Sequence, residues 1–358
     1  MGEVQEMKIT KKPFGTLATG EEVSVYTMSN KNGMQVSCLD YGAIVKNIMV
    51  PDKNGVVKDV VLGYDTLEGY VKDMSALGSF VGRHANRIKD AQFELNGVTY
   101  QLEKNDNNNN LHGGQPSYNK VMYEGDTFED EDSVSVEFSR LSKDMEQGFP
   151  GNLDLTVTYT LTEDNEFVIE YMAVSDKDTV LNLTNHSYFN LAGHDSGEVL
   201  EQQVTIYADQ FTPTDDELIP TGEYCNVEGT PMDFRTMKKI GADINADYEP
   251  LHQAKGYDHN FVISHQQNGE VELAAKLWDA ESGRLMEVYT DRPGVQMYTA
   301  NALVEHNCKG GITYGNRTGV CFETQNFPNA VNTKEFPSCI VKAEEEFNSV
   351  TVYKFSIQ

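Results

Sequence analysis

Short segments in which apolar and polar residues alternate recur along most of the chain. The clearest covers residues 153–161, L-D-L-T-V-T-Y-T-L, and places its five odd-numbered apolar residues on one face. Comparable strand patterns are found at 43–50, 133–140, 167–174, 203–207, 271–278, 285–289 and 349–357. An alternating pattern with a period of two is typical of strands that bury one face, so we expect a chain built mainly of β-strands.

Turn-forming residues separate these segments, at Lys53-Asn54-Gly55, Asn96-Gly97, Asn268-Gly269 and Ser282-Gly283. Asn-Gly pairs between short strands predict antiparallel hairpins. Convincing helices are few, and the best candidate covers residues 66–71, with Asp65 or Thr66 as its N-cap. Strands and helices do not alternate, which argues against a parallel α/β sheet. The pattern predicts an all-β fold, either an antiparallel sandwich or a barrel.

The length of 358 residues would accommodate two average domains or one large β-rich domain. We find no internal repeat and no linker rich in proline or serine, so we expect a single domain over residues 1–358. A hydrophobic content of 39% with 10% aromatic residues is enough to bury a core.

Acidic residues outnumber basic ones by 56 to 28, which gives a net charge of -28. Such a field repels nucleic acid and anionic membrane surfaces, so we expect neither as a partner. A neutral small molecule would not be repelled, whereas a phosphorylated one would need a local basic pocket. The sequence does not distinguish a monomer from a homodimer.

The five cysteines are odd in number and far apart, and no two form a C-x-x-C pair. This usage is typical of reduced thiols in the cytosol. The first ten residues lack the apolar core of a signal peptide, and no segment is as long as a membrane span. We therefore expect a cytoplasmic protein.

The densest acidic run is Glu129-Asp130-Glu131-Asp132. A solvated turn is the usual role of such a run. A bound Ca²⁺ is the alternative, although the spaced ligands of an EF-hand are lacking.

The stretch N-L-T-N-H-S-Y-F-N-L at residues 182–191 carries the first candidate chemistry. The alternation before His186 predicts a strand that leads into a loop, where a sheet commonly presents reactive groups. His186 can exchange a proton near neutral pH because the ordinary pKa of histidine is about 6.5. A lone histidine is more often a structural residue. Here the surrounding amides, hydroxyl and aromatic rings favour a sugar pocket, which needs flat apolar walls and a few polar groups.

This stretch resembles the signature of the galactose mutarotases, or aldose 1-epimerases, and the likeness covers nearly the whole chain. The resemblance implies one large antiparallel β-sandwich, of the type called a supersandwich. It also implies an isomerase of galactose metabolism that interconverts the anomers of free aldohexoses such as D-galactose and D-glucose and requires no cofactor.

The segment G-V-C-F-E-T-Q-N-F-P-N-A at 319–330 is the second strong motif. Glu323 ends an apolar run, and a carboxylate that is partly buried there would have a raised pKa. Taken alone, a glutamate exposed at a strand end is the better interpretation. The segment resembles the family's E-x-Q-x-x-P element, which implies that Glu323 is the general base and His186 the acid.

The segment G-R-H-A-N-R-I-K at 82–89 is a cationic island in an acidic chain. It could be a basic surface turn or an arginine fork that donates to sugar hydroxyls. The resemblance implies that Asn86 and Arg87 line the pocket and leaves the role of Arg83 open. The segment N-D-N-N-N-N-L-H-G-G at 105–114 must form a loop, and the resemblance makes its histidine, His112, a substrate contact.

Two further elements contribute polar groups. Asp258, in G-Y-D-H-N-F-V, could be a turn carboxylate, and the resemblance implies that it accepts hydrogen bonds from the sugar. Gln296 and Tyr298 share one side of a predicted strand. The resemblance makes Gln296 a substrate ligand, whereas Tyr298 could equally be a core residue. None of these motifs has the spacing of a metal site.

Ring opening and closure of a hexose needs a base at the hydroxyl on carbon 1 and an acid at the ring oxygen, which suits Glu323 and His186. Three other classes are possible. A glycosidase would use two carboxylates, such as Asp258 and Glu323. A sugar-binding module would need no catalytic pair. A hexose-phosphate mutarotase would need several cations around the phosphate.

Overall fold

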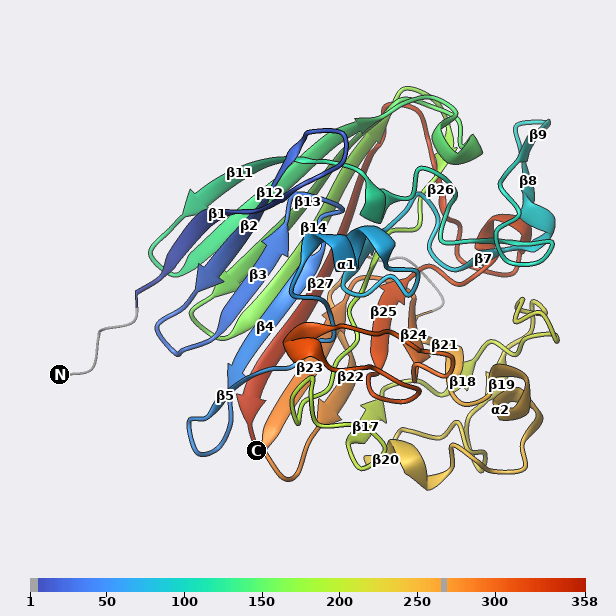
Figure 1. Ribbon diagram of the computed structural model, residues 1–358. Helices are drawn as coiled ribbons and strands as arrows, with labels where there is room; N and C mark the ends of the chain where they lie inside the picture. The colour runs from blue at the N-terminus through green and yellow to red at the C-terminus, as the bar shows by residue number, and fades with distance from the viewer. Residues whose placement is uncertain (1–5, 265–268) are drawn as a thin grey trace.

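The computed structural model describes residues 6–264 and 269–358. The regular secondary structure is almost entirely β-strand, and the long strands form the broad sheet that runs diagonally across Figure 1. Every pairing between named strands in this part of the chain is antiparallel. This confirms the predicted all-β antiparallel class.

The broad sheet has nine strands. Its order is β11 (Glu124–Glu129), β12 (Ser133–Ser142), β13 (Leu153–Thr162), β14 (Glu166–Ser175), β27 (Glu346–Ile357), β23 (Arg284–Thr290), β22 (Glu272–Trp278), β17 (Gln203–Ile206) and β20 (Lys238–Lys239).

Two sheets of five strands complete the main architecture. One has the order β1 (Lys8–Thr16), β2 (Glu22–Ser29), β3 (Gln35–Leu39), β4 (Val45–Pro51) and β5 (Val57–Asp59), and it lies beside β11 to β14 in Figure 1. The other has the order β19 (Cys225–Asn226), β18 (Gln210–Phe211), β21 (Asp258–Val262), β24 (Gly294–Tyr298) and β25 (Cys321–Gln325).

Shorter elements connect the sheets. The two-stranded pairs are β16 (Thr184–His186) with β6 (Ser79–Val81), β10 (Asn110–Leu111) with β7 (Arg87–Ile88), β15 (Thr179–Val180) with β26 (Ile340–Val341), and β8 (Gln92–Leu95) with β9 (Val98–Gln101). The α-helices are α1 (Leu67–Lys72) and α2 (Glu249–Ala254). Single 3₁₀ turns lie at Lys89–Ala91, Tyr118–Lys120, Glu146–Gly148, Ile240–Ala242, Lys309–Gly311 and Ala330–Asn332.

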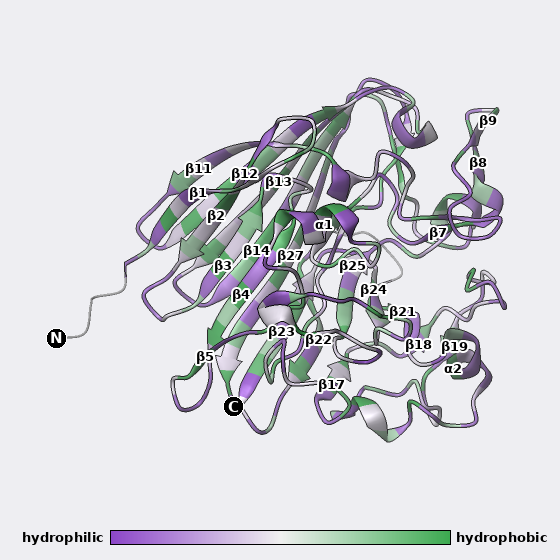
Figure 2. Cartoon of the chain, viewed as in Figure 1, coloured by the Kyte–Doolittle hydropathy of each residue, from purple (hydrophilic) through white to green (hydrophobic). Residues whose placement is uncertain are grey.

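The main core lies between the facing sides of the sheets. Apolar and polar positions alternate along the long strands in Figure 2, and the five odd-numbered residues of β13 that were predicted to face inward are fully buried. Tyr26 of β2 packs edge to face on Phe138 of β12, with ring centroids 5.3 Å apart. The hydroxyl of Tyr159 donates to the carbonyl of Ala43 over 2.7 Å. These contacts join the first five-stranded sheet to the nine-stranded one.

The predicted strands are all present, with boundaries shifted by up to three residues. Helix α1 has Thr66, not Asp65, as its N-cap, and the Thr66 hydroxyl accepts from the amide of Gly69. Asn96 and Gly97 both have positive φ, as a tight hairpin between β8 and β9 requires. The turn predicted at Asn268-Gly269 begins outside the described residues.

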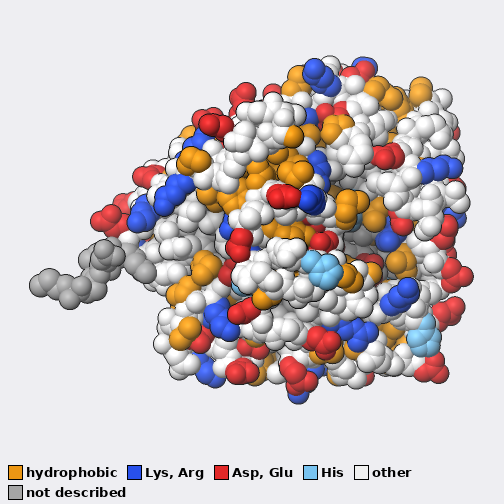
Figure 3. Space-filling model, in the orientation of Figure 1, with side chains coloured by type: hydrophobic (Ala, Val, Ile, Leu, Met, Phe, Trp, Pro, Cys, Tyr) orange, Lys and Arg blue, Asp and Glu red, His pale blue; other side chains and the backbone are white. Residues whose placement is uncertain are grey.

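Acidic side chains are spread over the face seen in Figure 3, among a smaller number of basic ones. The predicted acidic turn joins β11 to β12, and the Glu129 carboxylate accepts from the amide of Ile9. All five cysteines are free thiols. Among the described residues, no helix has the length and apolar character needed to cross a bilayer.

Candidate active site

A polar pocket of about 250 Å³ lies beside the second five-stranded sheet and receives side chains from seven separate chain segments. Six of the seven predicted site residues line it: Asn86, Arg87, His112, His186, Asp258 and Glu323. The seventh, Gln296, is buried next to it and donates from Nε2 to Asp258 Oδ1 over 2.7 Å. The structure therefore brings the whole predicted set together.

Strands β21, β24 and β25 position the pocket's acidic groups. Glu323 pairs with Gln296 across β25 and β24, and Tyr298 pairs with Asp258 across β24 and β21. Because strand residues alternate between faces, Cys321 lies on the same face of β25 as Glu323. Tyr298 lines the pocket, so it is not purely a core residue, which was the alternative left open by the sequence.

The Glu323 carboxylate is 2% exposed, and one of its oxygens approaches the imidazole of His186. Oε1 lies 3.6 Å from His186 Nε2, whereas the buried Oε2 has no partner among the described residues. Burial raises the pKa of Glu323 well above its usual range, and the negative charge of Asp258 adds to the effect, while Arg87 opposes it. The predicted rise in this pKa is thus present.

His186 is the last residue of β16 and pairs with Ser79 of β6, so it lies in a short strand and not in the predicted loop. The Thr184 hydroxyl donates to the carbonyl of Thr324, which fixes β16 beside β25. The imidazole stacks on the Tyr188 ring at 4.9 Å between centroids. Burial lowers the pKa of His186 to about 4, and a backbone hydrogen bond only partly offsets this. In the sugar-free pocket, burial therefore favours the neutral imidazole.

The amides around His186 have a different role from the one expected. Asn182 exchanges two hydrogen bonds with the main chain of Asn326, and Asn190 donates to the carbonyls of Gly197 and Thr318. None of these groups lines the pocket. The two amides tie neighbouring chain segments together, and Tyr188 is the aromatic wall that this stretch supplies.

The loop that carries His112 is hydrogen-bonded to Asn86, the residue before β7. The amide of Asn86 donates to His112 Nδ1 over 3.1 Å, and the amide of His112 donates to the carbonyl of Asn86. Both residues have positive φ. Gly113 follows with φ 83°, where a Cβ would lie 2.6 Å from the carbonyl oxygen of Gly82. Because Nδ1 accepts a hydrogen bond, the neutral His112 ring carries its hydrogen on Nε2.

Charged partners orient Arg87 in the pocket. Its Nε donates to Asp106 Oδ2 over 2.7 Å. Asp106 is not among the predicted site residues, although a lone carboxylate among the asparagines of 105–110 is a usable signal. Burial raises the pKa of Asp258, and the positive charge of Arg87 and the hydrogen bond from Gln296 oppose this.

The other arginine of the cationic island, Arg83, has a structural role. It is fully buried, which excludes the surface-turn interpretation for this position. Its guanidinium donates to the Ser142 hydroxyl and to the carbonyls of Ser142, Lys143, Phe149 and Pro150. Arg87 is therefore the one Lys or Arg side chain among the described pocket-lining residues.

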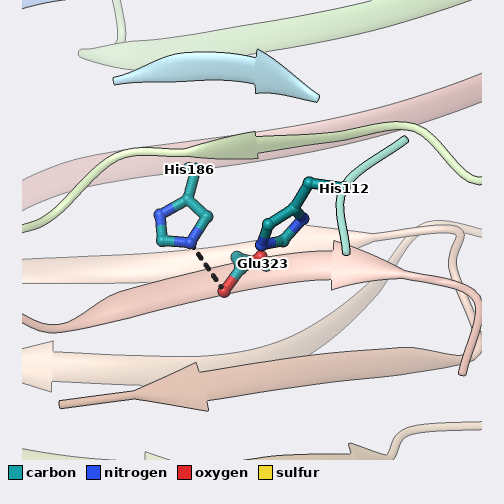
Figure 4. A group of neighbouring side chains, drawn as sticks. All are labelled: His112, His186 and Glu323. Carbon is teal, nitrogen blue, oxygen red and sulfur yellow. Dashed lines mark ion pairs between the residues drawn. The ribbon is translucent and has the colours of Figure 1, made fainter. Parts of the chain in front are cut away.

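His112, His186 and Glu323 converge closely enough to invite a metal-site interpretation (Figure 4). One ligand atom from each lies within 4.8 Å of the others. A metal ligand must offer a lone pair, but His112 Nδ1 already accepts from Asn86 and the remaining nitrogen carries a hydrogen. The His112 ring therefore does not fit a metal site. Its chemistry suits a donor to a sugar oxygen.

Comparisons with known proteins agree with this geometry. The family model for aldose 1-epimerase matches residues 24–354. Human galactose mutarotase is 39% identical over 98% of this chain and 99% of its own length. Aldose 1-epimerase of Escherichia coli K12 is 35% identical over 94% and 96%.

Solved structures also align over nearly the full length. Galactose 1-epimerase from Lactobacillus acidophilus superposes with a TM-score of 0.87 at 27% identity, covering 98% of this chain and 99% of that one. An aldose epimerase homologue from Caenorhabditis elegans gives 0.82 at 31% identity, covering 92% and 97%. The motifs, the fold and these likenesses agree, and the chain belongs to the aldose 1-epimerase family.

Proposed function

We propose that this protein interconverts the α and β anomers of free D-galactose and D-glucose, with Glu323 as general base and His186 as general acid. The observation that carries the proposal is the approach of Glu323 Oε1 to His186 Nε2, 3.6 Å apart in a pocket lined by hydrogen-bonding groups. The names of the full-length relatives support galactose as a substrate.

Ring opening transfers two protons in balance. The Glu323 carboxylate takes the proton of the hydroxyl on carbon 1, while the His186 imidazolium gives its Nε2 proton to the ring oxygen, as the bond from that oxygen to carbon 1 breaks. The new aldehyde group rotates about the bond to carbon 2, and the ring closes on its other face with the two roles reversed. No electrons are exchanged, so no redox cofactor is required.

The pocket's electrostatics suit this cycle. Burial favours the uncharged forms of Glu323 and His186, through the raised and lowered pKa values described above. The uncharged pair is the state that these residues reach when the ring has opened. The burial of these two groups thus favours the proton transfers that accompany opening.

The remaining side chains would hold the sugar while carbon 1 turns. Arg87 and the Nε2–H of His112 can donate to hydroxyl oxygens, and Asp258 can accept from a hydroxyl. Gln296 would act mainly through Asp258, because its Nε2 donates to that carboxylate. The main-chain amide of Asn86 would act through His112, because it donates to Nδ1 of that ring. Fixing the hydroxyls in this way keeps the aldehyde oxygen within reach of Glu323.

We also propose that the reaction needs no metal, since the hydrogen on His112 Nε2 argues against ligation there. Free thiols suit a cytoplasmic protein. A single domain, a monomer or homodimer and the lack of nucleic-acid or membrane partners stay predictions.

Polarimetry tests the activity directly. With freshly dissolved α-glucose or α-galactose, the purified protein is expected to speed the decay of optical rotation without added metal or nucleotide, and chelator should not slow it. Decay at the buffer rate for every common aldose would contradict the proposal and would favour a sugar-binding module.

Methyl galactosides separate this reaction from glycoside hydrolysis. Glu323 needs the proton of a free hydroxyl on carbon 1, and a methyl galactoside has none, so we expect it to stay intact and at most to inhibit. The measurement is methanol release over hours in a preparation that mutarotates galactose within minutes. Steady release that disappears in Glu323→Gln would indicate a glycosidase, with Asp258 as the partner carboxylate.

Hexose phosphates are poorer candidates than free sugars. A phosphate group is commonly bound by several cations. Arg87 is the single cation among the described pocket residues and already pairs with Asp106. Arg83 is committed to main-chain carbonyls.

A further inference from the structure

The second ring nitrogen of His186 faces a thiol. Cys321 Sγ lies 3.5 Å from His186 Nδ1, and both side chains are buried. Cys321 comes two residues before Glu323 on β25, so one strand contacts both nitrogens of the imidazole: Sγ approaches Nδ1, and Glu323 Oε1 approaches Nε2.

The reaction itself restricts the tautomer of this ring. In a reversible cycle, His186 Nε2 gives a proton to the ring oxygen on opening and takes it back on closure. Between these steps Nε2 must hold a lone pair, so the hydrogen of the neutral ring must stay on Nδ1. That hydrogen needs an acceptor, and the Cys321 sulfur is the side-chain group within reach.

We propose that Cys321 is a positioning residue for His186: its sulfur accepts a hydrogen bond from Nδ1–H and leaves Nε2 free to exchange a proton with the sugar. The inference rests on the proposed function, because the restriction on the tautomer comes from the reaction. His112 provides the contrast within the same pocket, since the amide of Asn86 donates to its Nδ1 and fixes the opposite tautomer.

A thiol differs from the carboxylate that often orients a catalytic histidine. Burial raises the pKa of Cys321 well above its usual range, and the charges of Glu323 and Asp258 add to this, so the sulfur stays uncharged at neutral pH. An uncharged, weak acceptor orients the ring without stabilising the imidazolium as a carboxylate would. His186 can therefore be held in place and remain a strong acid when protonated.

The other titratable groups that face the imidazole do not replace this contact. Tyr188 stacks on the ring face, and Tyr298 and His112 approach edge to face at 6.3 and 5.4 Å between centroids. Glu323 contacts the opposite nitrogen. Among the described side chains, Cys321 is the one with a hydrogen-bond contact to Nδ1.

Two substitutions test the proposal. Cys321→Ala is expected to lower kcat about tenfold or more with KM nearly unchanged, because proton transfer depends on the tautomer and sugar binding does not. Cys321→Ser should recover most of kcat. Its hydroxyl is a stronger acceptor and supports the imidazolium, so the pKa of His186 rises. As the pH falls, a second proton would then enter the Glu323–His186 pair at a higher pH than in the wild type. Activity should therefore be lost at that higher pH.

Nitrogen NMR of the wild-type imidazole provides a test that does not depend on any variant folding. We expect the Nδ1–H tautomer for His186 and the Nε2–H tautomer for His112. Cys339→Ala, which removes another buried thiol, should keep the wild-type kcat and pH profile. An Nε2–H signal from His186, or a folded Cys321→Ala with unchanged kcat, would overturn the role of Cys321. Inactive wild-type protein would overturn the proposed function instead.

Discussion

Glu323→Gln is expected to lower kcat at least about 10²-fold while the variant still binds galactose. The amide fills the same space but cannot take the proton of the hydroxyl on carbon 1. The substitution also removes the carboxylate whose Oε1 lies 3.6 Å from His186 Nε2. The loss should appear in kcat, because the lost interaction belongs to the proton-transfer step.

Polarimetry at saturating galactose measures the change in kcat, and isothermal titration measures binding. Glu287→Gln is the matched control, since this carboxylate lies on β23 and pairs with Lys276, outside the pocket. It should turn over at the wild-type rate. Near-normal turnover by Glu323→Gln would mean that another group is the base.

His186→Asn is expected to cause a loss of similar size, at least about 10²-fold in kcat. Asparagine can donate a hydrogen bond to the ring oxygen but cannot transfer a proton to it and recover it on closure. The two residues act as one proton-exchanging pair, so the double variant should be little worse than the poorer single variant.

His252→Asn on α2 serves as the control, because that imidazole is exposed and outside the pocket. Multiplied losses in the double variant would argue against a coupled pair. A His186→Asn variant with wild-type kcat would exclude this histidine as the acid.

The long strands were predictable because their period extends over many residues. In β13 every second side chain is buried, and the alternation is visible in the letters alone. β16 has three residues, too few for any period, and its strand geometry depends on pairing with β6. His186 was therefore expected in a loop, although its approach to Glu323 agrees with the resemblance.

The roles of other polar residues depended on partners remote in sequence. From the sequence alone, Arg83 could be a surface cation, whereas in the structure its guanidinium donates to main-chain carbonyls within residues 142–150. The amide of Asn182 suggested sugar recognition, yet it binds the main chain of Asn326. The position of Cys321 beside Glu323 could have been predicted, because a residue two positions before a strand glutamate lies on the same face of the strand.

The hydrogen bond from Thr184 to Thr324 joins positions 140 residues apart, and it holds the strand of the acid beside the strand of the base. Closing so long a segment costs chain entropy that a local hairpin such as β13–β14 does not bear. On dilution from denaturant, hairpins would therefore form early and the pocket late, and activity would return after the circular dichroism of the sheet. A partly folded chain would thus show the circular dichroism of the native sheet and still not interconvert the anomers of its sugar.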